Sequence, residues 1–127
     1  MDKYLMIKTR DEMLRIKVEH ILYFEADRNY TKLLLSQGIQ FTFAVNIGKV
    51  EEMLVSQLTE PNTILIRVGK SHIVNKDHIL QINLPKQKLL LLADEGKPRE
   101  LIIPKEPLRA LKDSLEAEVQ GGGKDID

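Results

Sequence analysis

Few side chains in this 127-residue sequence are of the types that carry out covalent chemistry. The chain has no cysteine, which excludes a thiolate nucleophile, and its three histidines are His20, His72 and His78. The spacing between His72 and His78 is not that of known zinc motifs, so we expect both at the surface and expect no metal. No serine stands in a Gly-x-Ser-x-Gly elbow, and the glycine-rich loops that bind nucleotide phosphates are absent. We therefore expect no cofactor.

Two carboxylates are the remaining candidates for acid–base work. Glu25 and Asp27 are two positions apart in a segment with strand character, so their side chains face the same side. General acid–base catalysis also needs a positioned partner group, and the sequence offers none beside them. A solvated strand edge explains this pair better, and an enzyme is the last of the functional hypotheses considered.

Charges that attract a polyanion are concentrated in one part of the chain. The whole sequence has 19 basic and 19 acidic residues, so its formal net charge is zero, whereas domains that bind nucleic acid are usually basic. Residues 61–92 nevertheless hold five basic side chains and one acidic side chain, while acids predominate after residue 92. The five are Arg67, Lys70, Lys76, Lys86 and Lys88, opposed by Asp77. This segment is either a binding face for a polyanion or an ordinary solvated face.

Alternation of apolar and polar residues predicts that the chain is mostly β-structure. The expected strands are residues 4–8, 13–18, 21–26, 30–35, 39–44, 64–68, 79–83, 88–93 and 100–103. The first five form a β-meander, with hairpin turns at 10–11 and at 36–38, where Gly38 allows a positive φ.

Two short helices complete the expected domain. Asn46 is a predicted N-cap, and apolar residues recur at helical spacing behind it, which predicts a helix over 47–57. Pro107 is tolerated in a first helical turn, which predicts a second helix over 107–118. We expect one domain over residues 1–118 and a mobile glycine-rich tail over 119–127. The sequence has neither a secretory signal nor a run of 18 apolar residues, so we expect a cytoplasmic protein without a membrane partner.

Two longer motifs are more specific than any of these single features. The first is ILYFEADRNYT at residues 21–31, and the second is IRVGKSHIVN at residues 66–75. The helix after Asn46 separates them, and LIIPK follows at residues 101–105. Together they resemble the LytTR DNA-binding domain, and the likeness extends over about residues 3–116.

The resemblance implies a fold, a function and a partner. The expected fold is elongated and mostly β, with small antiparallel sheets stacked side by side and loops that enter the grooves of double-stranded DNA. Similar proteins are bacterial transcription regulators that usually carry an N-terminal receiver domain. This chain begins a few residues before its first expected strand, so we expect either a stand-alone regulator or a fragment without its receiver.

The resemblance also assigns DNA contacts to three loops. The first loop carries Arg28, Asn29, Thr31 and Lys32, the second carries Arg67, Lys70 and Ser71, and the third carries Lys105. Amide and hydroxyl groups can pair with base edges, whereas lysine and arginine can also bind phosphate. Tyr30 is expected in the core instead, and Arg67 fits a salt bridge as well as a phosphate contact.

The chain departs from the family pattern at several positions in these loops. Lys70 stands where arginine or asparagine is common, which predicts weaker base discrimination because lysine lacks the planar fork of arginine. Gly69 replaces a common histidine, His72 replaces the usual aromatic residue, and Pro104 removes a hydroxyl and an N–H. Asn75 is interpreted as a turn residue.

The main alternative is a protein-interaction module. Such a domain would pair with another regulator through a free strand edge, for instance residues 4–8, and the zero net charge favours this hypothesis. A homodimer on repeated DNA sites is a further possibility within the DNA-binding hypothesis.

Overall fold

The computed structural model describes residues 3–59, 64–94 and 96–119 of the chain. The described part contains β-strands, two α-helices and two short 3₁₀ helices. They are β1 (Tyr4–Lys8), β2 (Met13–Lys17), η1 (Val18–His20), β3 (Ile21–Asp27), β4 (Tyr30–Leu35), β5 (Gln40–Phe43), α1 (Ile47–Gln57), β6 (Leu65–Val68), β7 (His72–Asn75), η2 (Lys76–His78), β8 (Ile79–Asn83), β9 (Lys88–Leu92), β10 (Pro98–Ile102) and α2 (Lys105–Glu118).

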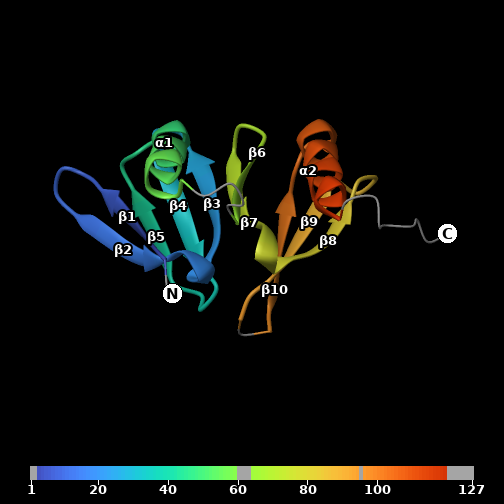
Figure 1. The fold of residues 1–127 in the computed structure, drawn as a ribbon, viewed down its shortest axis with the longest axis horizontal. Helices are drawn as coiled ribbons and strands as arrows, with labels where there is room; N and C mark the ends of the chain where they lie inside the picture. Colours follow the sequence, from blue (N-terminus) through green and yellow to red (C-terminus); the bar gives the residue numbers. More distant parts are fainter. Residues whose placement is uncertain (1–2, 60–63, 95, 120–127) are drawn as a thin grey trace.

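The strands form three antiparallel sheets, which confirms the predicted mostly-β fold with two helices. β1 and β2 form a hairpin, the central sheet has the order β5-β4-β3-β7-β6, and the last sheet has the order β10-β9-β8. Figure 1 shows the three sheets side by side along the longest axis of the molecule.

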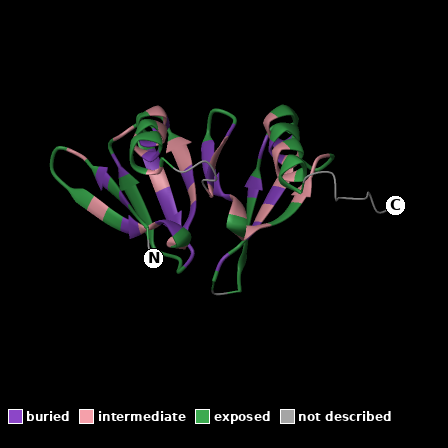
Figure 2. Ribbon diagram, in the orientation of Figure 1, coloured by how far each residue is buried: buried purple, intermediate pink, exposed green. Residues whose placement is uncertain are grey.

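The central sheet is covered on both faces by apolar cores. One core joins it to the β1–β2 hairpin and α1, and includes Leu5, Phe24 and Val50. The other joins it to the three-stranded sheet and α2, and includes Leu22 and Leu91. Each of these side chains is fully buried, and such burial stabilises the fold by about 1.5–3 kcal/mol per side chain. In Figure 2 the buried segments lie on the strands between these layers, and the outer faces of both helices are exposed.

Local sequence signals explain both helices. The Asn46 side chain accepts a hydrogen bond from the Lys49 N–H at 2.9 Å, so the predicted N-cap and the helix over residues 47–57 are confirmed. α2 begins at Lys105, two residues before the predicted start, because Pro104 only has to supply the carbonyl that accepts from the Leu108 N–H. Pro107 then lies in the first turn, as expected.

One central strand is absent from the sequence-based prediction. β7 pairs with both β3 and β6, and all four of its residues are buried. A strand covered on both faces lacks the polar–apolar alternation by which a half-buried strand is recognised. β7 is also only four residues long, between a turn and η2, so it offers too short a pattern to be recognised in the sequence.

One prediction concerns residues that are not described. The predicted tail, from residue 120 onward, lies outside the described residues. Within the described residues, no helix is long and apolar enough to span a membrane.

Candidate nucleic-acid interface

The three predicted loops lie next to one another at one end of the central sheet. The first is the β3–β4 turn at Arg28 and Asn29, and the second is the β6–β7 turn at residues 69–71. They are adjacent because the Ala26 N–H donates to the Ser71 carbonyl at 2.8 Å. A Cβ added to Gly69 would lie 3.1 Å from Pro107 Cβ, so the start of α2 packs directly against the second loop. The three loops therefore form a row along the upper edge of the molecule in Figure 1.

The β3–β4 turn projects three side chains into solvent. Asp27 pairs with Tyr30, which leaves a two-residue turn, and Arg28 adopts a positive φ of 59° in it. Arg28 and Asn29 are exposed, as a DNA contact requires. The expectation that Tyr30 lies in the core is wrong, because its side chain is 51% exposed. Tyr30 therefore joins the candidate residues, and the polar turn directly before it was the available signal.

Thr31 does not belong to the exposed surface. Its side chain is completely buried, and its hydroxyl donates to the Val45 carbonyl at 2.6 Å. This bond ties β4 to the segment that enters α1. The expected base contact by Thr31 is therefore not available, since its hydroxyl donor is already used inside the protein.

Lys32 is placed at the edge of the candidate surface. Its ammonium group lies 3.7 Å from the Asp27 carboxylate, and both side chains remain partly exposed. An exposed ion pair of this kind contributes at most about 1 kcal/mol. Phosphate can therefore replace Asp27 as the partner of Lys32 at little cost.

Arg67 holds the second loop in place. Its guanidinium donates to the carbonyls of Gly69 and Lys70, each at 3.0 Å, and to the Glu51 carboxylate on α1 at 2.8 Å. Of the two roles predicted for Arg67, the structure therefore shows the salt bridge. The positive φ of Gly69, 61°, is a conformation that L side chains rarely adopt, which explains why glycine occupies this turn.

Lys70 and Ser71 are exposed at the tip of the second loop. A groove of about 700 Å³ lies beside them, between this loop and the β10–α2 connection. Ile103, Pro104 and Pro107 form part of its opposite wall. The second and third loops thus share one concave surface.

His72 is buried beneath the second loop, which corrects the expectation of a surface histidine. Its Nε2 lies 3.2 Å from Glu25 Oε2 on β3 and donates to this carboxylate. Its ring centroid is 6.3 Å from that of Tyr23, so it packs where the family has an aromatic residue. Burial lowers the pKa of His72, although the Glu25 carboxylate acts in the opposite direction. Burial also raises the pKa of Tyr23, with a further contribution from Glu25.

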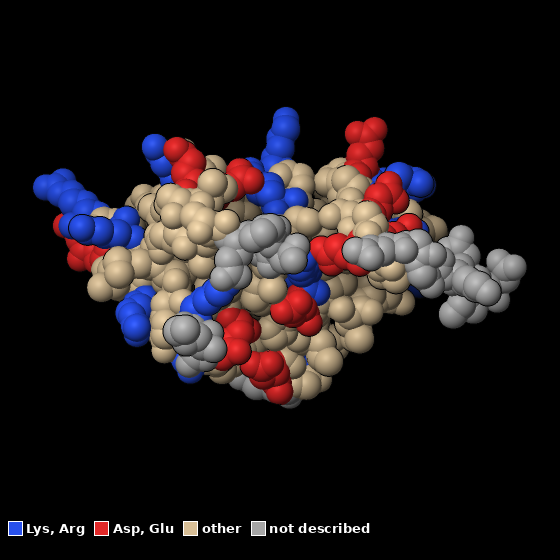
Figure 3. Space-filling view, in the orientation of Figure 1, with Lys and Arg blue, Asp and Glu red and all other residues tan. Residues whose placement is uncertain are grey.

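Each loop contributes one exposed basic residue that has no ion pair among the described residues. These residues are Arg28, Lys70 and Lys105, the last at the first position of α2. The N–H groups of a helix N-terminus attract phosphate, so Lys105 lies at a position that favours anions. In Figure 3, basic side chains project from the upper edge over the β6–β7 turn, with acidic side chains on either side.

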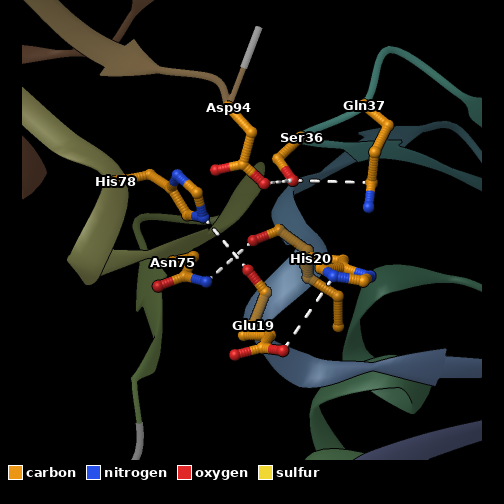
Figure 4. Close-up of polar contacts among 8 residues, drawn as sticks. Glu19, His20, Ser36, Gln37, Asn75, His78 and Asp94 are labelled. Atoms are coloured by element: carbon orange, nitrogen blue, oxygen red, sulfur yellow. Dashed lines mark hydrogen bonds and ion pairs between the residues drawn. The ribbon is translucent and has the colours of Figure 1, made fainter.

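Polar contacts at the opposite end join the central sheet to the three-stranded sheet. The two ring nitrogens of His78 lie 2.9 and 3.1 Å from the carbonyl oxygens of Leu92 and Glu19, respectively. The Ser36 hydroxyl donates to the Asp94 carboxylate at 2.7 Å (Figure 4). These contacts fix the relative position of the layers that carry the second and third loops.

Asn75 also has a structural role at this end of the molecule. Its buried amide donates to the Ile21 carbonyl at 2.8 Å (Figure 4). Its side-chain oxygen accepts from the Asp77 N–H at 2.9 Å. Asn75 is therefore the last residue of β7 and the N-cap of η2, which corrects its interpretation as a turn residue. Across the described ranges, no group of three histidine or acidic side chains is arranged to hold a metal ion.

Comparisons with known proteins agree with this arrangement. The profile of the LytTr DNA-binding domain family matches residues 11–116. Among solved structures, the chain is similar to the LytTr DNA-binding domain of a Bacillus cereus protein described as a methyl-accepting/DNA response regulator. That match has a TM-score of 0.60 and 21% sequence identity, and it covers 89% of this chain and 96% of the other. A search of curated proteins finds no match.

Proposed function

Because the chain belongs to the LytTr DNA-binding domain family, we propose that it is a bacterial transcription regulator that reads specific sequences of double-stranded DNA through its loops. The row of three adjacent loops supports this proposal most directly, because each loop has one exposed basic residue without an ion pair in the part of the chain that the structure describes. Such a row allows three separate contacts along one DNA duplex. The function also implies a cytoplasmic location, where bacterial DNA is found.

The candidate residues divide into two groups in this proposal. Arg28 and Lys105 bind phosphate and set the register, while Asn29, Lys70 and Ser71 approach base edges. Lys32 contributes to phosphate binding once it leaves Asp27.

Two residues support these contacts without making them. Arg67 positions the second loop, and Thr31 anchors the strand behind the first loop. A domain with so few direct contacts binds one site modestly, so we further propose that two copies occupy repeated sites, where linked binding raises the overall affinity.

The protein-interaction alternative loses its most obvious surface. The free edge of β1 is already occupied at its centre, because the Met6 N–H donates to Gln57 Oε1 and Gln57 Nε2 donates to the Met6 carbonyl, both at 2.8 Å. A side chain that satisfies these groups blocks the addition of a strand there. DNA binding is therefore the better-supported function.

Selection of bound sequences from a library of random duplexes tests the proposal. We expect a recurrent motif and a fall in affinity on combined substitution of Arg28, Lys70 and Lys105 by alanine. A matched variant that replaces three exposed cations outside the loops, Lys86, Lys97 and Arg99, should keep the motif and most of the affinity. Equal losses in both variants would show that binding depends only on total charge, and failure to enrich any motif would contradict sequence-specific reading.

A further inference from the structure

A second groove lies between β2 and β5, beside the core that the central sheet shares with the β1–β2 hairpin and α1 (the first core). Each of these strands is at the edge of its own sheet. The groove has a volume of about 330 Å³, and its walls include Leu14, Ile16 and Phe41. It is a seam where the β1–β2 hairpin and the central sheet approach each other without pairing.

The register shows that β2 presents backbone groups to this seam. Met6 on β1 is paired with Arg15 on β2, and both polar backbone groups of Met6 are bonded to Gln57 instead. In an antiparallel ladder, neither residue of such a pair bonds its partner. The N–H and carbonyl of Arg15 therefore point away from β1, toward the outer edge of β2.

The register also identifies the outward backbone groups of β5. The Leu35 N–H donates to the Ile39 carbonyl, and bonded pairs recur at every second residue of an antiparallel ladder. Phe41 is therefore bonded to β4, whereas the N–H and carbonyl groups of Gln40 and Thr42 point to the free edge. β5 contains neither proline nor a charged residue, the usual protections of an edge strand.

Apolar side chains next to this edge are only partly covered. Phe41 and Ile39 alternate along the chain with Phe43, which is 2% exposed in the first core. Phe41 is 36% exposed and Ile39 is 51% exposed, and both line the groove. An added strand would remove these side chains from water, and apolar burial favours its binding.

The charges around the seam select the kind of strand that fits. Arg15, Lys17 and His20 line the groove, and His20 Nε2 lies 3.9 Å from the Glu19 carboxylate, so the charge available to a partner at this groove is that of Arg15. The Arg15 guanidinium lies 3.7 Å from the centre of the Tyr4 ring, which holds it at the rim. A segment with acidic side chains therefore complements the seam, whereas a basic segment is repelled.

We propose that the seam binds an extended segment of a partner protein, in which acidic and apolar residues alternate, as an additional strand on β5. Lys17, His20 and Ile39 lie toward the end of the central sheet opposite the β3–β4 turn. The partner segment therefore lies on the edge of the central sheet opposite β6, away from the second loop, although Thr42 pairs with Lys32 beside the first loop. This inference is independent of the proposed DNA contacts.

A synthetic ten-residue peptide that alternates valine with aspartate and glutamate serves as the probe. On the full chain, we expect it to slow amide hydrogen exchange at Gln40 and Thr42 and to shift the NMR signals of β5. Thr42→Pro removes an outward N–H and is tolerated at such an edge position, so it should weaken peptide binding about tenfold or more. Thr42→Ala keeps the N–H and should bind the peptide as the unmodified chain does.

Charge reversal and oligomeric state complete the test. Arg15→Glu should weaken binding of the acidic peptide and strengthen binding of a peptide with lysine at the acidic positions. Circular dichroism and unaltered DNA binding would show that each variant is folded. Equal binding of both peptides to the unmodified chain, or full binding by folded Thr42→Pro, would overturn the proposal. So would dimerisation of the chain alone that Thr42→Pro abolishes, because β5 would then serve a second copy.

Discussion

The guanidinium of Arg67 on β6 lies 2.8 Å from the carboxylate of Glu51 on α1. The same guanidinium donates to the carbonyls of Gly69 and Lys70 in the second loop. One side chain therefore links that loop to α1. A planar group with several fixed donors can do this, whereas a lysine cannot. The position of Lys70 in the second loop therefore depends on Arg67.

Arg67→Gln should act through the loop. Loss of the three donor contacts should reduce the free energy of unfolding by about 1–3 kcal/mol, since each bond to a charged group contributes to stability. Hydrogen exchange at residues 69–71 should become faster, and DNA affinity should fall with little change in its salt dependence. A shift in the salt slope of about 0.9 without faster exchange would instead indicate that Arg67 binds phosphate directly.

Thr31→Val should separate stability from DNA binding. Valine has the shape of threonine but cannot donate to the Val45 carbonyl, so the folded protein should lose about 1–3 kcal/mol of stability, as measured by urea unfolding. DNA affinity at a temperature where the variant is folded should be unchanged.

Asn29→Ala is the natural comparison, because Asn29 is exposed in the same hairpin. It should leave stability nearly unchanged and weaken specific binding more than nonspecific binding, since a neutral amide releases no counterions. A loss of specific binding in Thr31→Val without any loss of stability would contradict the structural role of Thr31.

Lys70→Ala distinguishes base reading from phosphate binding at the second loop. If Lys70 reads a guanine, the substitution should cost about 1–3 kcal/mol and relax the preference at that base position. Titrations against a selected duplex and its single-base variants measure this directly. Equal weakening on every duplex would assign Lys70 to phosphate, and no weakening would remove it from the interface.

Sequence patterns were sufficient to predict strands and helices that have one face toward a core and the other toward solvent. β1 and β2 have one face toward a core, and α1 has one apolar stripe and an Asn46 cap, so period and cap residues revealed them. β3 and β4 contribute to both cores, and their longer apolar runs revealed them. β7 was not found because it is buried on both faces. The position of His72 in this buried strand also explains why its surface position was wrongly expected. A polar side chain is expected at the surface, but inside the protein His72 bonds to the Glu25 carboxylate.

The candidate site was predicted as a set of loops but not as individual contacts. The resemblance to the LytTR family located all three loops, and the structure places them side by side. Whether a polar side chain faces solvent depends on partners distant in sequence, such as Val45 for Thr31 and Glu51 for Arg67. The local sequence does not identify those distant partners. For this reason Thr31 was included among the predicted DNA contacts and Tyr30 was omitted.

The buried His72 predicts a pH dependence of stability. Its pKa is lowered in the folded protein from an ordinary value of 6.5, because burial disfavours the imidazolium. The unfolded chain therefore binds the proton more readily, so this stability is complete above about pH 6.5 and decreases as the pH falls below it. The free energy of unfolding, measured from about pH 7.5 to 5, should show this decrease.

Two variants assign that decrease to His72. His72→Gln keeps a donor for Glu25 but does not titrate, so the decrease should become smaller. Glu25→Gln removes the charge that favours the imidazolium, so the decrease should become steeper. An unchanged profile in both variants would assign the pH dependence to other groups.

The salt dependence of DNA binding tests how many of the candidate cations reach phosphate. Arg28, Lys70 and Lys105 are exposed and lack ion pairs among the described residues, whereas Lys32 is paired with Asp27 and Arg67 with Glu51. Each phosphate that is neutralised contributes about −0.9 to the slope of log K against log salt, so three contacts predict a slope of about −2.7. If Lys32 and Arg67 exchange their carboxylates for phosphate, the slope should approach about −4.5.

Fluorescence anisotropy with a selected duplex over a range of salt concentrations measures this slope. Asp27→Asn releases Lys32 from its ion pair and should make the slope steeper, whereas Lys32→Ala should leave it unchanged if Lys32 stays paired. The alanine variant of Arg28, Lys70 and Lys105 should reduce the slope toward zero. A slope near zero for the unmodified chain would falsify the proposed DNA interface, because neutral side chains alone cannot produce the counterion release that loop binding to phosphate requires.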